Sequence, residues 1–236
     1  MSLFTVPKFR LTIIFWVNVF LFNHVIAQNW QSASNLNTAR HTHSVVNLPD
    51  GKAIIIAGSV SGHNNGTSSC EIYNPVNNSL SNTGSMSNSR YFHTSTLLPD
   101  GKIIIAGGYG GYYHSSCELY NPSSGTWSNT GSMNYASYGH TATLLNNGKV
   151  LITGGHSGYN LSRCELYDTS TGSWSSTSSL PLTIWGHTAT LLPSGKVLVV
   201  GGATTYFGYN LTATAALYDP SNGTWSSTGS MSTVRV

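Results

Sequence analysis

The chain has 236 residues, of which only 7% are charged, and it carries a formal net charge of +3. This length is enough for one large domain with a continuous core. When Lys8 and Arg10 near the N-terminus are set aside, eight basic residues stand against seven acidic ones, without a basic cluster. Such a balance offers no electrostatic basis for binding nucleic acid.

Residues 1–27 have the pattern of a secretory signal peptide. Lys8 and Arg10 form a positive region, residues 11–22 are mostly apolar, and Ala27 ends a candidate cleavage site. The apolar stretch is short and polar residues follow it, which favours cleavage over a membrane span. An uncleaved signal anchor is the alternative, and only then would the protein be attached to a membrane.

Five Asn-x-Ser/Thr sequons agree with secretion, because all of them fall in predicted loops. The sequons are at Asn65, Asn77, Asn160, Asn210 and Asn222. We therefore expect an extracellular glycoprotein.

One phrase returns four times along the rest of the chain. It begins with His-Thr-Ala-Thr-Leu-Leu or a variant, followed by a turn with Gly-Lys, an apolar run and a glycine pair. The phrase begins at His43, His93, His140 and His187, at steps of 50, 47 and 47 residues. A period of about 50 residues is typical of propeller blades. The copies span approximately residues 40–86, 90–133, 137–180 and 184–231.

The third copy illustrates the predicted elements, in chain order. Strand a covers residues 140–145, and a hairpin turn at 146–149 leads into strand b at 150–153. A loop then leads to strand c at 164–167, and strand d begins at 173–175. Four antiparallel strands joined by short turns make one blade. We therefore predict an all-β fold with four recognisable four-stranded blades.

The repeats resemble the kelch family. The residues that carry the resemblance are a glycine pair followed by Tyr and Trp, namely Gly107-Gly108 with Tyr120 and Trp127, Gly154-Gly155 with Tyr167 and Trp174, and Gly201-Gly202 with Tyr218 and Trp225. The first copy departs from this pattern, with Gly58-Ser59 for the pair and Leu80 for the Trp. The resemblance spans residues 28–236 and implies a kelch-type β-propeller. The family includes binding modules, scaffolds and oxidases, so it leaves the function open.

Both ends of the repeat region suggest an incomplete ring. Residues 28–36 resemble an isolated outer strand, because Trp30 and Leu36 have the spacing that later copies have between Trp and Met. Arg235-Val236 resembles the opening of a fifth copy. We favour a truncated chain, since an open sheet edge is an aggregation hazard. The alternative is a strained ring of four blades closed over Trp30.

The three cysteines, Cys70, Cys117 and Cys164, occupy one repeat position, and Ala215 takes this position in the fourth copy. Equivalent positions in neighbouring blades lie too far apart for a disulfide. We expect buried structural thiols, with a redox or metal role as the alternative.

The histidines that begin the copies are the candidate metal ligands. His43, His93, His140 and His187 would lie at one height around the channel mouth, where a ring of imidazoles could bind zinc or copper. The other interpretation, which we favour, is a repeated hydrogen bond between blades. No carboxylate recurs beside them to support a metal.

An Arg and a Glu occur together in two copies, as Arg40 with Glu71 and Arg90 with Glu118. The fourth copy has Ile184 and Ala216 instead and so loses both charges together. This favours a structural ion pair over acid–base catalysis. The third copy retains Glu165 but has Ser137, and Arg163 could replace the missing Arg.

The loops between strands b and c hold the candidate binding residues. These loops are predicted on the same face as the histidines, and their aromatic residues are Tyr109, Tyr112, Tyr113, His114, Tyr159, Tyr206, Phe207 and Tyr209. Exposed aromatic side chains with few charges suit stacking on sugar rings or anchoring a protein partner. The alternative is that they fold back onto their own blades.

No nucleophile elbow, phosphate-binding loop or zinc-protease motif is present, and no helix follows the glycines at 107–111. We therefore predict a secreted, non-catalytic module without a cofactor that binds a protein or glycan. One alternative is a fragment of a galactose- or glyoxal-oxidase-like copper enzyme, whose cysteine–tyrosine crosslink the strand-c cysteines do not match. An intracellular adaptor is a third interpretation, which the leader and the sequons disfavour.

Overall fold

The computed structural model describes residues 32–61, 65–205 and 210–234. The chain divides into two compact units, residues 1–33 and 34–236, and the second holds all the strands below. The predicted signal peptide and residues 235–236 lie outside the described residues. Within the described residues, no helix has the length and apolar character needed to cross a membrane.

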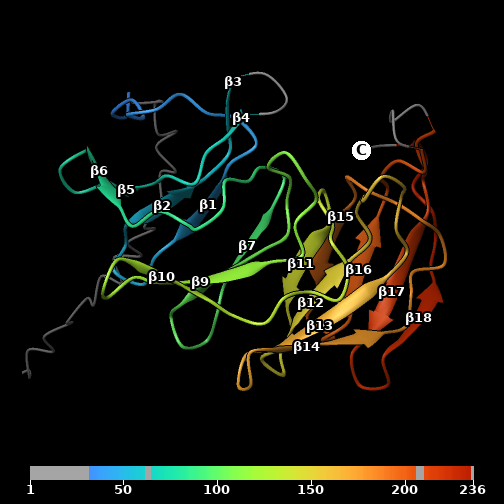
Figure 1. Ribbon diagram of the computed structural model, residues 1–236. Coiled ribbons are helices and arrows are strands. Elements are labelled where there is room, and N and C mark those ends of the chain that lie inside the picture. The colour runs from blue at the N-terminus through green and yellow to red at the C-terminus, as the bar shows by residue number, and fades with distance from the viewer. Residues whose placement is uncertain (1–31, 62–64, 206–209, 235–236) are drawn as a thin grey trace, which may run out of the picture. The chain divides into compact units, whose positions relative to one another are not determined.

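Four sheets of four antiparallel strands follow one another along the chain (Figure 1). Blade 1 contains β1 (Ser44–Asn47), β2 (Ala53–Ile56), β5 (Cys70–Asn74) and β6 (Ser79–Thr83). Blade 2 contains β7 (Thr94–Leu97), β8 (Ile103–Ala106), β9 (Cys117–Asn121) and β10 (Thr126–Asn129). Blade 3 contains β11 (Thr141–Leu144), β12 (Val150–Thr153), β13 (Cys164–Asp168) and β14 (Ser173–Thr177). Blade 4 contains β15 (Thr188–Leu191), β16 (Val197–Val200), β17 (Ala215–Asp219) and β18 (Thr224–Ser227).

The strands of each blade pair in chain order, so the predicted all-β blades are confirmed. In blade 3 the register pairs Ile152 with Ala142 on one side and with Glu165 on the other. The loop after β2 carries an additional two-stranded sheet, formed by β3 (Ser59–Ser61) and β4 (Asn65–Gly66). Residues 32–36 are the described part of the predicted outer strand 28–36, and they form no strand. Ser34 instead hydrogen-bonds Asn78, at the turn before β6.

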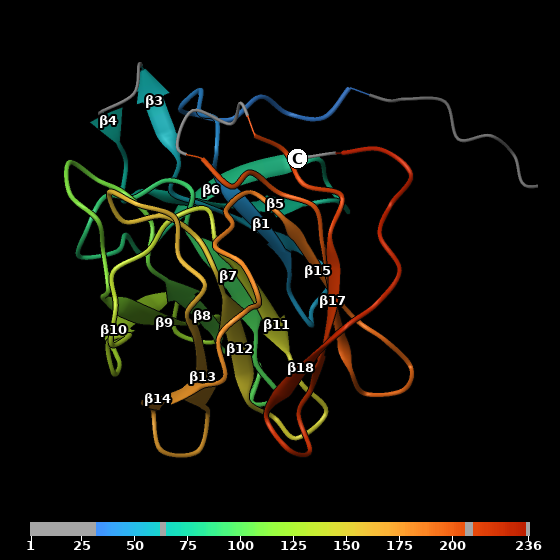
Figure 2. The ribbon, with the colours of Figure 1, turned by 90° about the vertical axis from the view of Figure 1, so that its right-hand side faces the viewer.

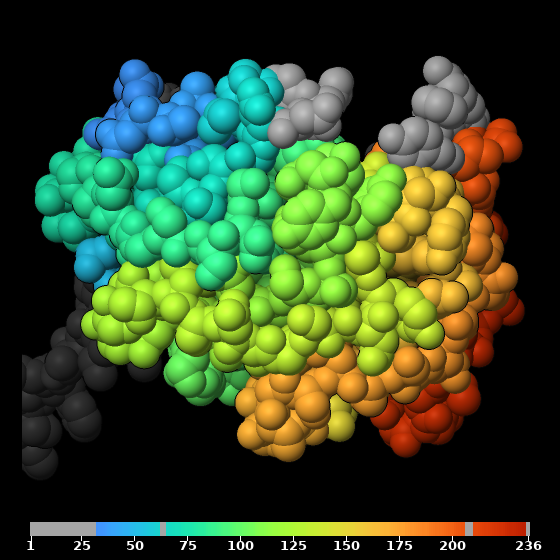
Figure 3. All heavy atoms as spheres, viewed as in Figure 1, coloured from blue at the N-terminus to red at the C-terminus, as the bar shows by residue number. Residues whose placement is uncertain are grey.

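The inner strands of consecutive blades lie side by side, β1 with β7, β7 with β11 and β11 with β15. Figure 2 shows these four strands towards the middle of the blades, with β10, β14 and β18 farther out. In the space-filling view the blades follow one another in chain order across the molecule (Figure 3). The first strand of each repeat is therefore the innermost one, as the propeller interpretation requires.

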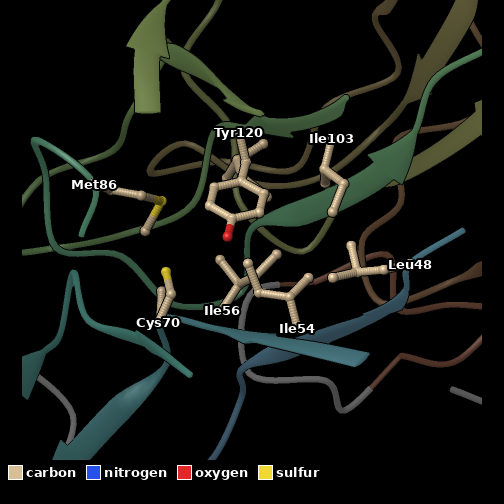
Figure 4. Close-up of a cluster of buried hydrophobic side chains, with 9 residues drawn as sticks. Leu48, Ile54, Ile56, Cys70, Met86, Ile103 and Tyr120 are labelled. Carbon is tan, nitrogen blue, oxygen red and sulfur yellow. The ribbon is translucent and has the colours of Figure 1, made fainter. Parts of the chain in front are cut away.

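Three hydrophobic cores join the four blades. In the first core, Ile54, Ile56 and Cys70 of blade 1 face Ile103 and Tyr120 of blade 2 (Figure 4). The second and third cores repeat this arrangement between blades 2 and 3 and between blades 3 and 4. The described residues form no such cluster between blades 4 and 1. Trp30, over which a four-blade ring would close, lies outside the described residues.

The recurring Tyr and Trp pack at these interfaces and also hydrogen-bond the preceding blade. The hydroxyl groups of Tyr120 and Thr83 lie 2.6 Å apart, and the indole N–H of Trp127 donates to the carbonyl of Gly84 at 2.8 Å. The same two contacts recur at the next two interfaces. Aromatic side chains thus supply both buried area and directional bonds between blades.

The second glycine of each pair is required by a close approach. A Cβ on Gly108 would lie 2.9 Å from the Cβ of His93, and one on Gly58 would lie 2.9 Å from that of His43. Gly58 is therefore the second member of the pair in the first copy. The pair there is Ala57-Gly58, with Ala57 at φ +54°, so the assignment to Gly58-Ser59 was wrong by one residue.

The cysteines are buried, unpaired thiols in the interblade cores. Each thiol donates to the carbonyl of a serine two residues earlier, at 3.5 to 3.6 Å. Burial raises the pKa of Cys70 to about 11 and the pKa values of Cys117 and Cys164 to about 12. Reactive thiols need the opposite shift, so the structure agrees with the structural interpretation.

Candidate functional site

One end of the blades brings two kinds of segment together. These are the loop between the second and third strands of each blade and the connection that enters the inner strand of the same blade. Isolated bridges pair the connection with the loop, joining Tyr91 to Tyr109, Tyr138 to His156 and Trp185 to Ala203. In Figure 1 this end is marked by β3 and β4 at the upper edge. The predicted position of the loops, on the face where the inner strands begin, is confirmed.

A group of aromatic rings covers this end. Tyr109 and Tyr113 have ring centroids 5.3 Å apart, and Tyr113 stacks on Tyr138 at 5.7 Å with an angle of 2° between the ring planes. Tyr138 also lies 5.7 Å from Phe92 and 6.1 Å from Trp185. Apart from the exposed Phe92, these rings are only half-buried. The rings therefore pack on one another while keeping part of their surface available to a ligand.

The other predicted loop aromatics have different environments. Tyr112 and Tyr159 are each 59% exposed. His114 is buried instead, 3.2 Å from the carbonyl of Ser89, and burial lowers its pKa. The prediction of an exposed His114 is thus wrong, because the imidazole lies beneath Tyr112 with their ring centroids 4.3 Å apart. The candidates Tyr206, Phe207 and Tyr209 lie outside the described residues.

We define the aromatic face as Phe92, Tyr109, Tyr112, Tyr113, Tyr138, Tyr159 and Trp185. Phe92, Tyr138 and Trp185 are not among the predicted binding residues, because they lie in connections between blades rather than in the loops after the second strand. For Tyr138 and Trp185 the sequence holds a signal, since an aromatic or imidazole ring stands two residues before the inner-strand histidine in every copy. These residues are His41, Tyr91, Tyr138 and Trp185.

The charged residues lie mostly at the other end of the blades. The described lysines and aspartates form four ion pairs at turns there, joining Asp50 to Lys52, Asp100 to Lys102, Lys149 to Asp168 and Lys196 to Asp219 at 2.9 to 3.1 Å. At the aromatic end the exposed charge among the described residues is Arg163, whose guanidinium lies 3.7 Å from the centre of the Tyr135 ring. The aromatic face itself has no charged side chain.

The inner-strand histidines connect neighbouring blades. The Nε2 atom of His93 lies 2.8 Å from the hydroxyl of Ser44, and that of His140 lies 2.9 Å from the hydroxyl of Thr94. His187 contacts Thr141 in the same way, at 3.1 Å. Burial lowers the pKa of His93 to about 3 and the pKa values of His140 and His187 to about 4, so all three are neutral.

The structure therefore agrees with the hydrogen-bonding interpretation of these histidines. Among the described residues, no three His, Cys, Asp or Glu side chains are close enough together to hold a metal ion. The cysteines are buried in interblade cores.

The buried Arg–Glu pairs are confirmed in the first two copies. Arg40 lies 2.8 Å from Glu71 and Arg90 lies 3.0 Å from Glu118, and all four side chains are buried. The prediction that Arg163 replaces the missing Arg in the third copy is wrong, because its guanidinium lies over Tyr135. Glu165 accepts backbone N–H groups of Asn134 and Tyr135 instead, at 2.8 and 3.2 Å.

The structure distinguishes one sequon from the others. Four of the five asparagines are exposed: Asn65, Asn77, Asn210 and Asn222. Asn160 is half-buried, and its amide donates to the carbonyl of Ala203 at 3.2 Å while its oxygen lies 2.9 Å from Nδ1 of His156. A glycan on Asn160 would therefore require these bonds to break.

Comparison with known proteins agrees with this architecture. The family model described as the kelch motif matches residues 90–134 and 138–181. Among 332 solved chains with significant structural similarity is one titled "Structure of YjhT", with a TM-score of 0.71 and 18% identity. The similarity covers 87% of this chain and 75% of that one, and at this identity it shows the fold alone. No curated protein matches the sequence significantly. With kelch motifs matched in its second and third blades and the same blade built four times, the chain has the fold of a kelch-type β-propeller.

Proposed function

We propose that this protein is a secreted, non-catalytic module that binds a protein or glycan through its aromatic face. A kelch-repeat propeller supports an interaction module in general. The observation that carries the assignment is the set of contiguous, partly exposed rings at the end of the blades that has few charges. Surface aromatics with polar tips favour recognition, since each ring offers a large rigid area at low entropic cost.

The absence of a catalytic role rests on the environment of the reactive groups. The thiols are protonated and buried, and the inner histidines use Nε2 to contact the preceding blade. A surface pocket of about 300 Å³ lies at the charged end, between the turns that contain Asp50 and Asp100. Its two carboxylates, Asp50 and Asp100, are each paired with a lysine at 2.9 Å, which favours a structural role for them.

The binding face is tested with a double variant, Tyr112→Ala/Tyr159→Ala. Both side chains are 59% exposed, so their removal should change stability little. We expect it to reduce binding in a glycan array and in capture of secreted proteins by at least about tenfold. The matched control is Val76→Ala, because Val76 is 93% exposed at a turn of the charged end. If Val76→Ala lost binding and the double variant did not, the ligand would bind at the charged end and the proposed aromatic face would be wrong.

Secretion is tested by the intact mass of the protein released from eukaryotic cells, with and without glycosidase. We expect cleavage after Ala27 and glycans on exposed sequons such as Asn65 and Asn77, with Asn160 unmodified because its amide is bonded. A retained and unglycosylated product would contradict the extracellular assignment.

A further inference from the structure

The residue before each inner-strand histidine has a left-handed backbone. The four residues at this position are Thr42, Phe92, Gly139 and Gly186, with φ between +52° and +65°. Their peptide groups form a row of hydrogen bonds across the blades. Phe92 donates to Thr42 at 3.3 Å, Gly139 donates to Phe92 at 3.0 Å and Gly186 donates to Gly139 at 2.9 Å. The row, rather than any side chain, therefore dictates this conformation.

Thr42 and Phe92 are the unexpected members of the row, and Phe92 is the bulkier and more exposed of the two. Glycine adopts positive φ without strain, and blades 3 and 4 use it. A bulky residue at φ +52° is a genuine outlier. Burial does not explain it, since Phe92 is 41% exposed while core residues of the same blade are almost fully buried. Strained residues of this kind concentrate at functional sites.

Phe92 has aromatic neighbours on the adjoining blade. Its ring centroid lies 5.7 Å from that of Tyr138, which in turn lies 6.1 Å from that of Trp185. The glycine at position 139 makes room for this arrangement, because a Cβ there would lie only 3.2 Å from the Trp185 ring. Phe92, Tyr138 and Trp185 therefore form a continuous row of rings, partly open to solvent, beside the innermost strands.

The charge around this row indicates the chemistry of the ligand. The described lysines and aspartates are paired at the far end of the blades. Tyr109 and Tyr113 stand beside Tyr138 and present phenolic hydroxyl groups that can donate and accept. Aromatic faces carry negative partial charge and attract the C–H groups of a ligand. A sugar ring combines apolar C–H faces with a rim of hydroxyl groups, and an uncharged sugar needs no ion pair.

We propose that Phe92, Tyr138 and Trp185 form a stacking subsite for one sugar ring of an uncharged oligosaccharide, with Phe92 as a specificity-determining residue. This rests on the proposed function, because it names the ligand of the same aromatic face. Phe92 places a ring at a position where the left-handed backbone favours glycine. Thr42 has the same φ, but only Phe92 adds an exposed ring to the row with Tyr138 and Trp185, and contact with a ligand explains that ring.

The test is the substitution Phe92→Gly. It places at this position the residue that blades 3 and 4 already use, so the fold should persist and the melting temperature should be unchanged or higher. Binding of cellohexaose, xylohexaose and mannohexaose is measured by calorimetry and by tryptophan fluorescence, with an oligogalacturonate of the same length as the charged comparison. We expect one of the uncharged hexasaccharides to bind, and Phe92→Gly to weaken that binding by at least about tenfold.

Two variants control for the backbone change. Thr42→Gly makes the same conformational change in blade 1 without removing a ring, and it should bind as the unmodified protein does. Phe92→Tyr retains the ring at the same φ and should retain most of the affinity.

Unchanged hexasaccharide affinity in Phe92→Gly would overturn the subsite. Binding of the charged oligogalacturonate alone, or no hexasaccharide binding at all, would overturn the ligand class. In those cases the Tyr112→Ala/Tyr159→Ala variant still reports on the proposed function, since that variant leaves the three rings of the subsite in place.

Discussion

Blades 2 and 4 share a backbone but fill one buried position with opposite chemistry. In blade 2, Arg90 is fully buried and contacts Glu118 at 3.0 Å and the carbonyl of Gly107 at 2.8 Å. In blade 4 the same positions hold Ile184 and Ala216, which are also buried. The main-chain bond from the second glycine is unchanged, since Gly58 donates to Arg90 and Gly155 donates to Ile184.

A third residue changes together with the pair. The second carboxylate oxygen of Glu118 accepts the backbone N–H of Ser87 at 2.8 Å. The residue of blade 4 that corresponds to Ser87 is Pro181, which has no N–H to satisfy. The carboxylate is therefore absent where both of its partners are absent.

Blade 3 shows that the buried Glu can be present without the Arg. It has Ser137 in place of the Arg, and it retains Glu165 because the N–H groups of Asn134 and Tyr135 still need an acceptor. The comparison teaches that blades can satisfy their buried polar groups in different ways, and that the Arg–Glu ion pair is one of them. The fold does not require it, since blades 3 and 4 form the same sheet without it.

The largest expected effect concerns what blades 2 and 4 share, the neutral buried histidines. The pKa values of His93, His140 and His187 are lowered to about 3 or 4, whereas a histidine in the unfolded chain has its ordinary pKa of about 6.5. As the pH falls below that value, the unfolded state takes up protons first, so stability is lost through this window and is constant above it.

Each histidine should contribute about 1.4 kcal/mol per pH unit between about pH 6.5 and 4. Urea unfolding at several pH values measures the slope. His140→Gln should reduce the slope by the contribution of one histidine, and a stability independent of pH in this range would contradict buried neutral imidazoles.

The next largest loss of stability is expected when the Arg90–Glu118 ion pair of blade 2 is broken. Arg90→Ile leaves the Glu118 carboxylate buried without its guanidinium, and we expect a loss of about 3–5 kcal/mol in the free energy of unfolding. Denaturant unfolding measures the loss. A melting temperature equal to that of the unmodified protein would show that the pair has no structural role.

A smaller effect is expected when blade 2 receives the complete set of blade 4. The variant Ser87→Pro/Arg90→Ile/Glu118→Ala removes the acceptor together with both donors, so no buried charge remains unpaired. We expect it to unfold within about 2 kcal/mol of the unmodified protein, and therefore to be more stable than Arg90→Ile alone. If the triple variant were the less stable of the two, the explanation by matched partners would be wrong.

The smallest effect concerns the cysteine position. Cys117→Ala gives blade 2 the residue that blade 4 has in Ala215 and removes one buried sulfur from an interblade core. We expect a loss of about 1 kcal/mol, from the transfer and cavity contributions of a single atom. Thermal unfolding under reducing conditions measures it, with Cys164→Ala as the matched variant. A loss as large as that of Arg90→Ile would point to a further role for the thiol.

Much of the fold could be predicted from the sequence because the repeat imposes its own period. The glycine turns, the Asn-Gly hairpin of blade 3 and the Tyr and Trp positions recur at fixed spacing, so four blades and their cores follow from local pattern. The candidate site was less accessible. Tyr109 and Tyr113 were found because they lie in a variable loop, whereas Phe92, Tyr138 and Trp185 lie in connections between blades. His114 was misjudged, because the fold of the loop buries it beneath Tyr112.

The sequence by itself determined the blade, since alternation of apolar residues and turn chemistry are local properties of about 47 residues. Only the tertiary structure decided which side chains of different blades meet. The contact of His140 with Thr94, the separation of charges from rings and the grouping of Phe92, Tyr138 and Trp185 all cross a blade boundary. Such contacts depend on how one sheet packs against the next, and the spacing along the chain does not contain that information.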